Sequence, residues 1–133
     1  GLLYIAADNA GLQIVDVSNP SSPAQAGVYD AWQTIQSVAA ARSPSGKTLA
    51  YILGEVLGQD GQWQNRLGVL DVSDPGNPIE LGFYRFLTES KSVVVADGGP
   101  GGPYIYVANG SGGLAILRLR YSCFLPVLLR SGP

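Results

Sequence analysis

The sequence predicts an all-β protein built from the four-stranded antiparallel sheets, called blades, of a β-propeller. The composition, a long internal repeat and the spacing of that repeat support this prediction. Apolar residues make up 46% of the chain and charged residues 14%, and the 18 glycines and 9 prolines favour short strands joined by turns. Repeats spaced by about 47 residues, with four strands each, are typical of propeller blades.

The repeat is clearest in two segments, LQIVDVSNPSSPAQAGVYD at 12–30 and LGVLDVSDPGNPIELGFYR at 67–85, which align without a gap. A third, partial copy at 105–120 matches residues 3–18. The middle copy carries an insertion of eight residues within 54–66. The three copies therefore predict three successive blades.

Each copy contains apolar segments that we expect to be consecutive strands of one sheet. The first three strands are nearly continuous apolar runs, as expected when neighbouring sheets cover both faces, and the outer strand is more mixed. The expected strands, from the inner to the outer position, are 37–41 and 92–96; 3–7, 50–54 and 105–108; 12–17, 67–72 and 114–119; and 24–30 and 79–85.

These strands divide the chain into a partial first blade at 1–35, a second blade at 36–90, a partial third blade at 91–120 and a C-terminal tail at 121–133. We expect an incomplete propeller, since roughly two and a half to three blades fall short of the minimum of about four in a closed ring. Its open ends are expected to meet the remaining blades of a longer propeller or a second copy of the chain.

The third copy departs from the pattern after Leu117, where RLRYS replaces DVSNP. We therefore expect the turn into a fourth strand to be lost there. The tail, which contains the lone Cys123, is expected to form either a closing outer strand or an exit segment, and Pro126 argues against a central strand.

The stretch SPSGKT at 43–48 resembles the end of a phosphate-binding loop. Such a loop requires a second glycine five positions before Gly46 and a helix after it, but Ala41 and the apolar segment LAYIL occupy those places. Ser43, Pro44 and Gly46 instead fit the first, second and fourth positions of a type I turn. We interpret the stretch as a turn between two strands.

The segments DVSNPSSP at 16–23 and DVSDPGNP at 71–78 are expected to be turns, in which Asn19 or Asp74 accepts backbone hydrogen bonds. Asp16 and Asp71 are alternatively catalytic carboxylates, but residues that recur once per blade favour a structural role. The residues assigned to these turns are Asp16, Ser18, Pro20, Asp71, Ser73 and Pro75.

The same segments carry a resemblance to a known family. Gly11-Leu12 followed by IVDVSNP at 14–20, and Leu67 followed by VLDVSDP at 69–75, each with a further proline three residues on, resemble the LVIVD repeat. The resemblance covers residues 2–120. It implies β-propellers, mostly in secreted or surface-attached proteins of prokaryotes, and no general catalytic activity.

Both tryptophans are expected on one face of the propeller, among the loops that join the second strand to the third and one blade to the next. Indole and amide groups together suit a glycan or a peptide, because the ring offers a flat apolar surface and the amides offer directional hydrogen bonds. Alternatively, each tryptophan covers a hydrophobic edge between blades. The candidate ligand-binding residues are Trp63, Trp32, Gln62, Gln64, Asn65, Gln33 and Asp60.

The composition argues against several other kinds of site. The chain has no histidine and one cysteine, its eight basic residues are scattered, and it has no apolar run long enough to span a membrane. We expect no metal, no cofactor, no nucleic-acid partner and no membrane span.

We expect a non-catalytic binding or interaction module that, by the family resemblance, is extracellular or on the cell surface. One alternative is part of a propeller-fold hydrolase or lyase that uses acidic residues of the loops, with Asp8, Asp30, Asp60 and Glu89 as candidates. Another is a purely structural component of a surface layer.

Overall fold

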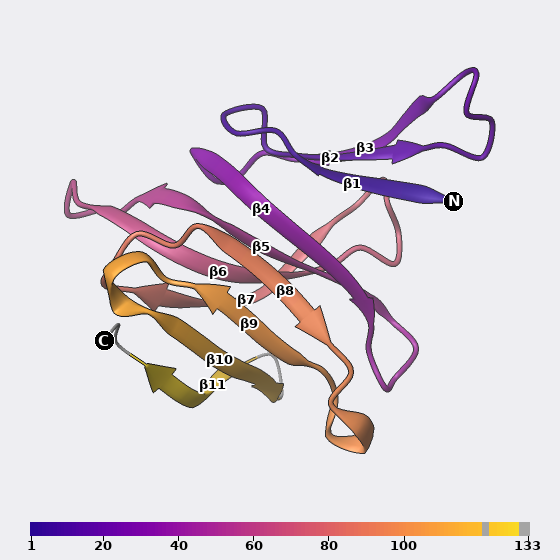
Figure 1. Cartoon of the computed structure of the whole chain (residues 1–133). Coiled ribbons are helices and arrows are strands. Elements are labelled where there is room, and N and C mark those ends of the chain that lie inside the picture. The colour runs from indigo at the N-terminus through magenta and orange to yellow at the C-terminus, as the bar shows by residue number, and fades with distance from the viewer. Residues whose placement is uncertain (121–122, 131–133) are drawn as a thin grey trace.

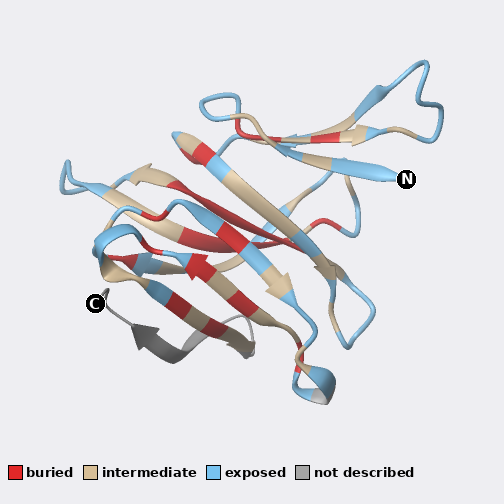
Figure 2. Cartoon of the chain, in the orientation of Figure 1, coloured by how far each residue is buried: buried red, intermediate tan, exposed pale blue. Residues whose placement is uncertain are grey.

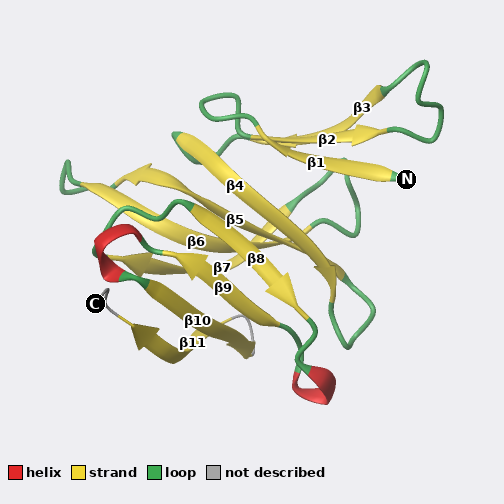
Figure 3. Cartoon of the chain, in the orientation of Figure 1, coloured by secondary structure: helices red, strands yellow, loops and turns green. Residues whose placement is uncertain are grey.

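The computed structural model describes residues 1–120 and 123–130, which form three antiparallel β-sheets and two short 3-10 helices (Figure 1; Figure 3). The all-β prediction is confirmed. The elements are β1 (Leu2–Ala6), β2 (Leu12–Asp16), β3 (Ala24–Tyr29), β4 (Thr34–Arg42), β5 (Thr48–Leu57), β6 (Trp63–Asp71), β7 (Ile79–Phe86), β8 (Ser92–Ala96), η1 (Gly99–Gly101), β9 (Tyr104–Ala108), η2 (Gly110–Gly112), β10 (Leu114–Arg120) and β11 (Cys123–Arg130).

Each sheet follows the order of the chain. Sheet 1 is β1-β2-β3, sheet 2 is β4-β5-β6-β7 and sheet 3 is β8-β9-β10-β11. Consecutive strands pair antiparallel throughout, so each sheet is a simple meander. The three sheets form no closed barrel, as expected for part of a propeller.

Two hydrophobic cores fill the spaces between neighbouring sheets (Figure 2). Leu12 and Ile14 of sheet 1 pack against sheet 2, and Leu67 and Val69 of sheet 2 pack against sheet 3. These are equivalent positions of the repeat, so each blade contributes the same side chains to the same kind of interface. Alternation along β6 sends Leu67 and Val69 to one core and Leu70 to the other, which explains the continuous apolar run.

The outer strand of every sheet contains an irregularity at the same place. The pairing register shifts between Ile14 and Val15 in sheet 1, between Val69 and Leu70 in sheet 2, and between Ile116 and Leu117 in sheet 3. In each case one extra residue lies on the outer strand, which is the geometry of a β-bulge and increases the local twist.

The tail takes the first of the two forms that the sequence left open. Cys123–Arg130 forms β11, the closing outer strand of sheet 3. Because Arg120 and Cys123 are paired, the connection contains only two residues and needs no DVSNP turn. Pro126 lies on an edge strand, the position where proline is tolerated. Residues 121–122 and 131–133 of the predicted tail lie outside the described residues.

The predicted turn at 43–48 is confirmed. The backbone N–H of Gly46 donates to the carbonyl of Ser43 over 2.9 Å, and Gly46 has a φ of 87°. The strand β5 begins at Thr48, where a phosphate-binding loop would need a helix.

Candidate functional site

The connections between strands gather at two opposite ends of the sheets (Figure 1). We call one end the loop face; it holds the β1–β2, β5–β6 and β9–β10 connections together with the two that join successive sheets. The other end, the turn face, holds the β4–β5 and β8–β9 connections and the turns before β3 and β7. This is the arrangement that the repeat predicts.

The insertion of the second blade forms two longer strands rather than a loop. Its residues add the cross-strand pairs Gly54↔Arg66, Glu55↔Asn65, Val56↔Gln64 and Leu57↔Trp63 to the β5–β6 hairpin. A five-residue turn then closes the hairpin, with a hydrogen bond of 2.8 Å from the Gly58 amide to the Gln62 carbonyl. The shorter hairpins close in the same way, from Ala7 to Gly11 and from Asn109 to Gly113. The β5–β6 hairpin is therefore a rigid ribbon that stands above the loop face.

Trp63 lies at the end of this ribbon and is 55% exposed. Its cross-strand partner Leu57 is also exposed, so the two side chains form an apolar pair on one side of the ribbon. The amide of Leu57 donates to Oε1 of Gln33 over 2.9 Å, which ties the ribbon to the connection between sheets 1 and 2. The structure thus brings Gln33 to the ribbon that carries Trp63.

The polar candidates of the ribbon are held by neighbouring groups. Oε1 of Gln64 accepts hydrogen bonds from Nε and Nη2 of Arg66 over 3.0 and 2.8 Å. The guanidinium carbon of Arg66 lies 3.9 Å from the centre of the Phe83 ring. In the turn, Oδ1 of Asp60 accepts the Gln62 amide over 3.0 Å. These contacts limit the side-chain motion of Gln64 and Asp60.

The strand register divides the predicted residues between the two sides of the ribbon. Successive residues of a strand point to opposite faces, so Trp63 and Asn65 lie on one side and Gln64 on the other. A ligand that stacks on Trp63 would therefore lie closer to Asn65 and the turn residues than to Gln64.

Trp32 belongs to the core between sheets 1 and 2, where only 4% of its surface is exposed. Its ring occupies the space above Gly68, where an added Cβ would lie 2.6 Å from the indole. Its Nε1 donates to Oε1 of Glu80 over 3.1 Å. The interpretation that Trp32 covers an edge between blades fits this position, and we leave Trp32 out of the candidate surface.

A pocket of about 350 Å³ opens on the same loop face, between sheets 2 and 3. Its back is formed by the buried Asn109, whose carbonyl accepts the Thr88 hydroxyl over 2.8 Å and whose Oδ1 faces the Ser90 hydroxyl at 3.4 Å. The lining residues are Tyr84, Arg85, Phe86, Leu87, Thr88, Asn109 and Gly112. No sequence pattern indicates this pocket, because its walls come from two blades.

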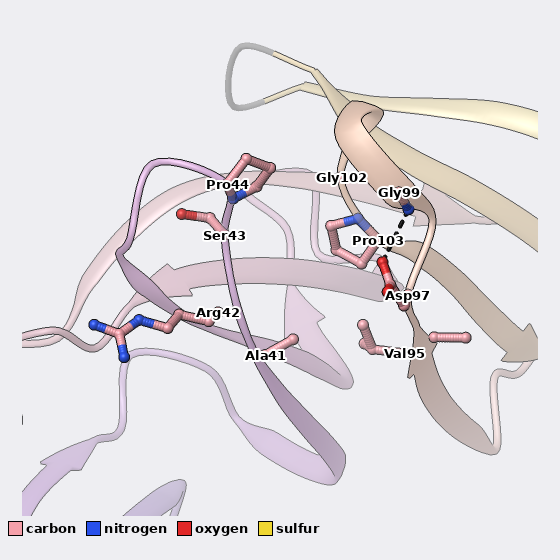
Figure 4. A pocket seen from close by; sticks show the side chains of 10 residues that line it. Ala41, Arg42, Ser43, Pro44, Val95, Asp97, Gly99, Gly102 and Pro103 are labelled. Carbon is pink, nitrogen blue, oxygen red and sulfur yellow. Dashed lines mark hydrogen bonds between the residues drawn. The ribbon is translucent and has the colours of Figure 1, made fainter.

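A second pocket, of about 340 Å³, lies on the turn face between the β4–β5 turn and the loop that contains η1 (Figure 4). Its two charged residues each form a hydrogen bond to the backbone of their own loop. Oδ1 of Asp97 accepts the Gly99 amide over 2.9 Å, and Arg42 extends away from Asp97 and donates from Nε to the Gly46 carbonyl over 3.3 Å. The pocket therefore offers mainly the surfaces of small apolar residues.

Two aspartates of the predicted turns accept hydrogen bonds within those turns. Oδ1 of Asp16 accepts the Ser18 amide over 2.9 Å, and Oδ1 of Asp71 accepts the Ser73 amide over 3.0 Å. The hydrogen bonds from Ser18 and Ser73 lower the pKa of Asp16 and Asp71, respectively. Carboxylates held ionised in this way stabilise turns.

The third blade has Arg118 where the other two have this aspartate. Its Nη2 donates to the carbonyls of Gly98 and Gly102 over 2.6 and 3.1 Å, and its guanidinium carbon lies 4.2 Å from the centre of the Tyr104 ring. In the second blade, the equivalent Asp71 reaches Lys47 of the β4–β5 turn. Arg118 and Asp71 therefore each connect the third strand of their blade to the turn between its first two strands.

The acidic candidates of the hydrolase or lyase alternative are distributed over the loop face. Asp8 lies in the β1–β2 turn, Asp30 after β3, Asp60 at the end of the ribbon, and Glu89 forms an exposed ion pair of 2.8 Å with Lys91. Within residues 1–120 and 123–130, no three Asp, Glu or Cys residues gather closely enough to hold a metal ion.

The comparison with known families agrees with this architecture. The LVIVD repeat matches residues 1–31, 61–85 and 92–117, one segment in each sheet. The chain belongs to the LVIVD repeat family. LVIVD repeats form β-propellers, so the three sheets of this member are propeller blades. No curated protein matches the chain.

The segment 32–60, between the first two matched segments, contains Trp32 and the first strand of the long ribbon. Among the described residues, no helix is long and apolar enough to cross a bilayer.

Proposed function

We propose that this LVIVD propeller is a non-catalytic binding module, extracellular or at the cell surface, which holds a glycan or peptide ligand on its loop face. The observation that carries the proposal is Trp63, a large aromatic side chain left 55% exposed at the end of a rigid ribbon. Exposed aromatic residues on fixed scaffolds are preferred contact points, because little conformational entropy is lost when they bind.

The groups around Trp63 support a ligand that is partly apolar and partly polar. Leu57 extends the apolar surface, while the turn residues Asp60 and Gln62 and the neighbouring Gln33 supply hydrogen-bonding groups. A pyranose ring or an apolar side chain of a peptide stacks on the indole, and the amides fix its orientation.

Binding is tested by the tryptophan fluorescence of a Trp32→Phe variant, in which Trp63 is the only tryptophan. We expect a ligand from a glycan array or a peptide library to shift or quench this emission. Trp63→Ala in the wild-type background is expected to weaken binding of that ligand at least tenfold without changing the thermal unfolding midpoint. The matched control is Ile79→Ala, which removes a similarly exposed side chain (51%) at the opposite end of the sheets.

Three outcomes contradict the proposal. Binding that survives Trp63→Ala would place the ligand elsewhere, and the pocket behind Leu87 would then be the next site to test. Turnover of an ester or polysaccharide by the protein, lost on substitution of Asp60 or Glu89, would instead support the hydrolase or lyase alternative. If no ligand is found in either library, the structural role in a surface layer is favoured.

We also infer that a further blade, from the remaining part of a longer propeller or from a second copy, covers the outward face of sheet 3. Tyr106 on that face is the repeat equivalent of Tyr51, which is buried between sheets 2 and 3. Val94 and Leu114 lie beside it, and both are exposed. Light scattering of the chain with and without Tyr106→Arg tests for a second copy: a dimer that the substitution dissociates supports it, and a monomer excludes it.

A further inference from the structure

The loop-face pocket between sheets 2 and 3 contains an amide group that the fold leaves unpaired. Asn109 is 9% exposed and forms the back of this pocket. Its backbone N–H donates to the Gly113 carbonyl, its carbonyl accepts the Thr88 hydroxyl, and its Oδ1 faces the Ser90 hydroxyl. Among the described residues nothing accepts a hydrogen bond from its Nδ2, and this atom is not closed off from solvent. The two hydrogens of Nδ2 are therefore available to a ligand.

The residues around Asn109 leave space beside this amide. A Cβ added at Gly112, which also lines the pocket, would lie 2.6 Å from Nδ2 of Asn109 and 2.8 Å from Oγ1 of Thr88. The missing side chain of Gly112 thus keeps both polar atoms accessible. Because the Thr88 hydroxyl uses its hydrogen on the Asn109 carbonyl, its lone pairs remain as acceptors. The back of the pocket therefore offers one donor group and one acceptor side by side.

The repeat does not require this asparagine. The turn that begins at Asn109 closes in the same way in the other two blades, where Ala7 and Gly58 donate the equivalent backbone hydrogen bond. Neither of these residues has a polar side chain, so the turn forms without one. The polar back of the pocket is therefore not imposed by the architecture of the blade.

The walls of the pocket are mainly apolar. Phe86 and Tyr84 pack in the core between sheets 2 and 3, and Leu87 is 92% exposed at the open side. Arg85 also belongs to the lining, but alternation along β7 directs its side chain to the other face of sheet 2, where Arg66 is its cross-strand partner. A carboxylate or a phosphate would lose hydration here without gaining a charged partner. The pocket therefore favours a neutral ligand.

The group that complements these features is an acetamido group. Its carbonyl oxygen accepts from Nδ2 of Asn109, its N–H donates to Oγ1 of Thr88, and its methyl group packs against Phe86 and Leu87. The volume of about 350 Å³ lies near the lower end of the range of about 300–1,000 Å³ for ligand pockets. This size suits a single small unit, such as one monosaccharide.

The β5–β6 ribbon indicates that a sugar carries the acetamido group. Asn65 lies opposite Phe86, and Trp63 follows two residues further on the same side of the ribbon, about 7 Å along the strand. The indole of Trp63 is 55% exposed and suits the apolar face of a pyranose ring. A glycan with one unit in the pocket can therefore extend along the ribbon toward Trp63.

We propose that the pocket between sheets 2 and 3 binds the acetamido group of an N-acetylated hexosamine, with Asn109 and Thr88 as its hydrogen-bonding residues. This inference rests on the proposed binding function of the loop face and makes its ligand specific. The ligand is a glycan that contains an N-acetylated hexosamine, and Trp63 contacts the next unit of the same glycan.

The test titrates the whole, isotope-labelled chain with N-acetylglucosamine and follows the side-chain amide signals of Asn109 by nuclear magnetic resonance. Glucose and glucosamine, which lack the acetyl group, are the control sugars. We expect the Asn109 signals to shift with N-acetylglucosamine. The control sugars should bind at least tenfold more weakly, because a site built to hydrogen-bond a group rejects analogues that lack it.

Three variants examine the residues. Asn109→Asp keeps the size of the side chain but replaces the donor with an acceptor, and we expect it to weaken binding at least tenfold. Asn77→Asp makes the same charge change in the turn before β7 and should leave binding unchanged. Leu87→Ala should weaken binding about threefold through loss of apolar contact. Because Leu87 is exposed, this variant should keep the wild-type thermal midpoint, so it tests the pocket even if Asn109→Asp does not fold.

The inference and the proposed function can fail separately. The inference is overturned if N-acetylglucosamine does not bind, if glucose binds equally well, or if Asn109→Asp binds as the wild type does. A library ligand that is lost on Trp63→Ala would still support the proposed function in each of these cases. N-acetylglucosamine alone should bind equally to Trp63→Ala, since Trp63 contacts the next unit. An acetyl-lysine peptide that binds more tightly than the sugar would assign the pocket to a protein ligand and would also overturn the inference.

Discussion

The indole Nε1 of Trp32 donates a hydrogen bond of 3.1 Å to Oε1 of Glu80, on the face of sheet 2 that meets sheet 1. Trp32 precedes the innermost strand of the sheet and Glu80 lies on its outermost strand, so the indole crosses the width of the blade above Gly68. Burial, with a contribution from Glu80, also raises the pKa of the nearby Tyr29 to about 12.

Trp32→Ala is expected to destabilise the protein by about 3–5 kcal/mol, because it leaves a cavity between sheets 1 and 2. Trp32→Phe should destabilise the protein less, since the phenyl ring still fills most of the space and only the hydrogen bond to Glu80 is lost. Urea unfolding measures both. The matched control is Leu87→Ala, because Leu87 is the repeat equivalent of Trp32 but is 92% exposed and should change stability by less than about 0.5 kcal/mol.

Gly27→Ala is expected to disrupt the contact between sheet 1 and the turn before β7. A Cβ added at Gly27 would lie only 1.7 Å from the carbonyl oxygen of Pro75, so the backbone of one element must move. Gly76→Ala is the control in the same turn, because its Cβ would meet only Oδ1 of Asp74 at 3.6 Å. We expect a lower thermal midpoint for Gly27→Ala and little change for Gly76→Ala; equal midpoints would contradict this contact.

Asp71 is expected to make stability depend on pH in the acid range. The Ser73 amide and hydroxyl, followed by Lys47, lower the pKa of Asp71 in the folded state. Its contribution is therefore present above the unfolded-state pKa of about 3.9 and is lost as pH falls through the folded-state value. Urea midpoints measured from pH 6 to pH 2.5 should fall less steeply for Asp71→Asn than for the wild type. Lys47→Gln should change the profile less, because the backbone bond remains.

Tyr51 is expected to titrate late and to weaken the fold at high pH. Burial raises its pKa to about 12, so the folded state resists ionisation that the unfolded chain undergoes near pH 10. The unfolded state then binds fewer protons than the folded state, and stability falls as pH rises from about 10 to 12. Absorbance titration at high pH should show one fewer late-titrating tyrosine in Tyr51→Phe. An unchanged titration would contradict the assigned burial.

Much of the fold is predictable from the sequence, because it depends on local patterns that recur. The apolar runs fix the strands, the Asp-Val-Ser segments fix the turns before β3 and β7, and Gly46 fixes the turn before β5. Alternation within a run also places Leu67 and Leu70 in different cores.

Other features depend on contacts between segments that no local pattern specifies. The polar residues of 54–66 favour a loop in the sequence. In the structure, cross-strand pairing makes most of this segment part of the ribbon that carries Trp63. Trp32 and Leu87 occupy equivalent positions, yet Trp32 is buried over Gly68 and Leu87 is exposed. The sequence also left the tail open between a closing strand and an exit segment, because β11 follows a two-residue connection in place of the turn motif.

The recurring five-residue turn means that the height of the β5–β6 ribbon and the shape of its tip are separable properties. Adding or deleting cross-strand pairs two at a time would raise or lower the tip while returning every side chain to its original side. The pairs from Leu53↔Leu67 downward match those of the shorter hairpins, and the two outermost pairs, Val56↔Gln64 and Leu57↔Trp63, extend beyond the strand pairing of β4 and β7, so changes at the tip leave the strand pairing beneath in place. Such a scaffold lends itself to the grafting of longer or shorter recognition arms onto an unchanged propeller.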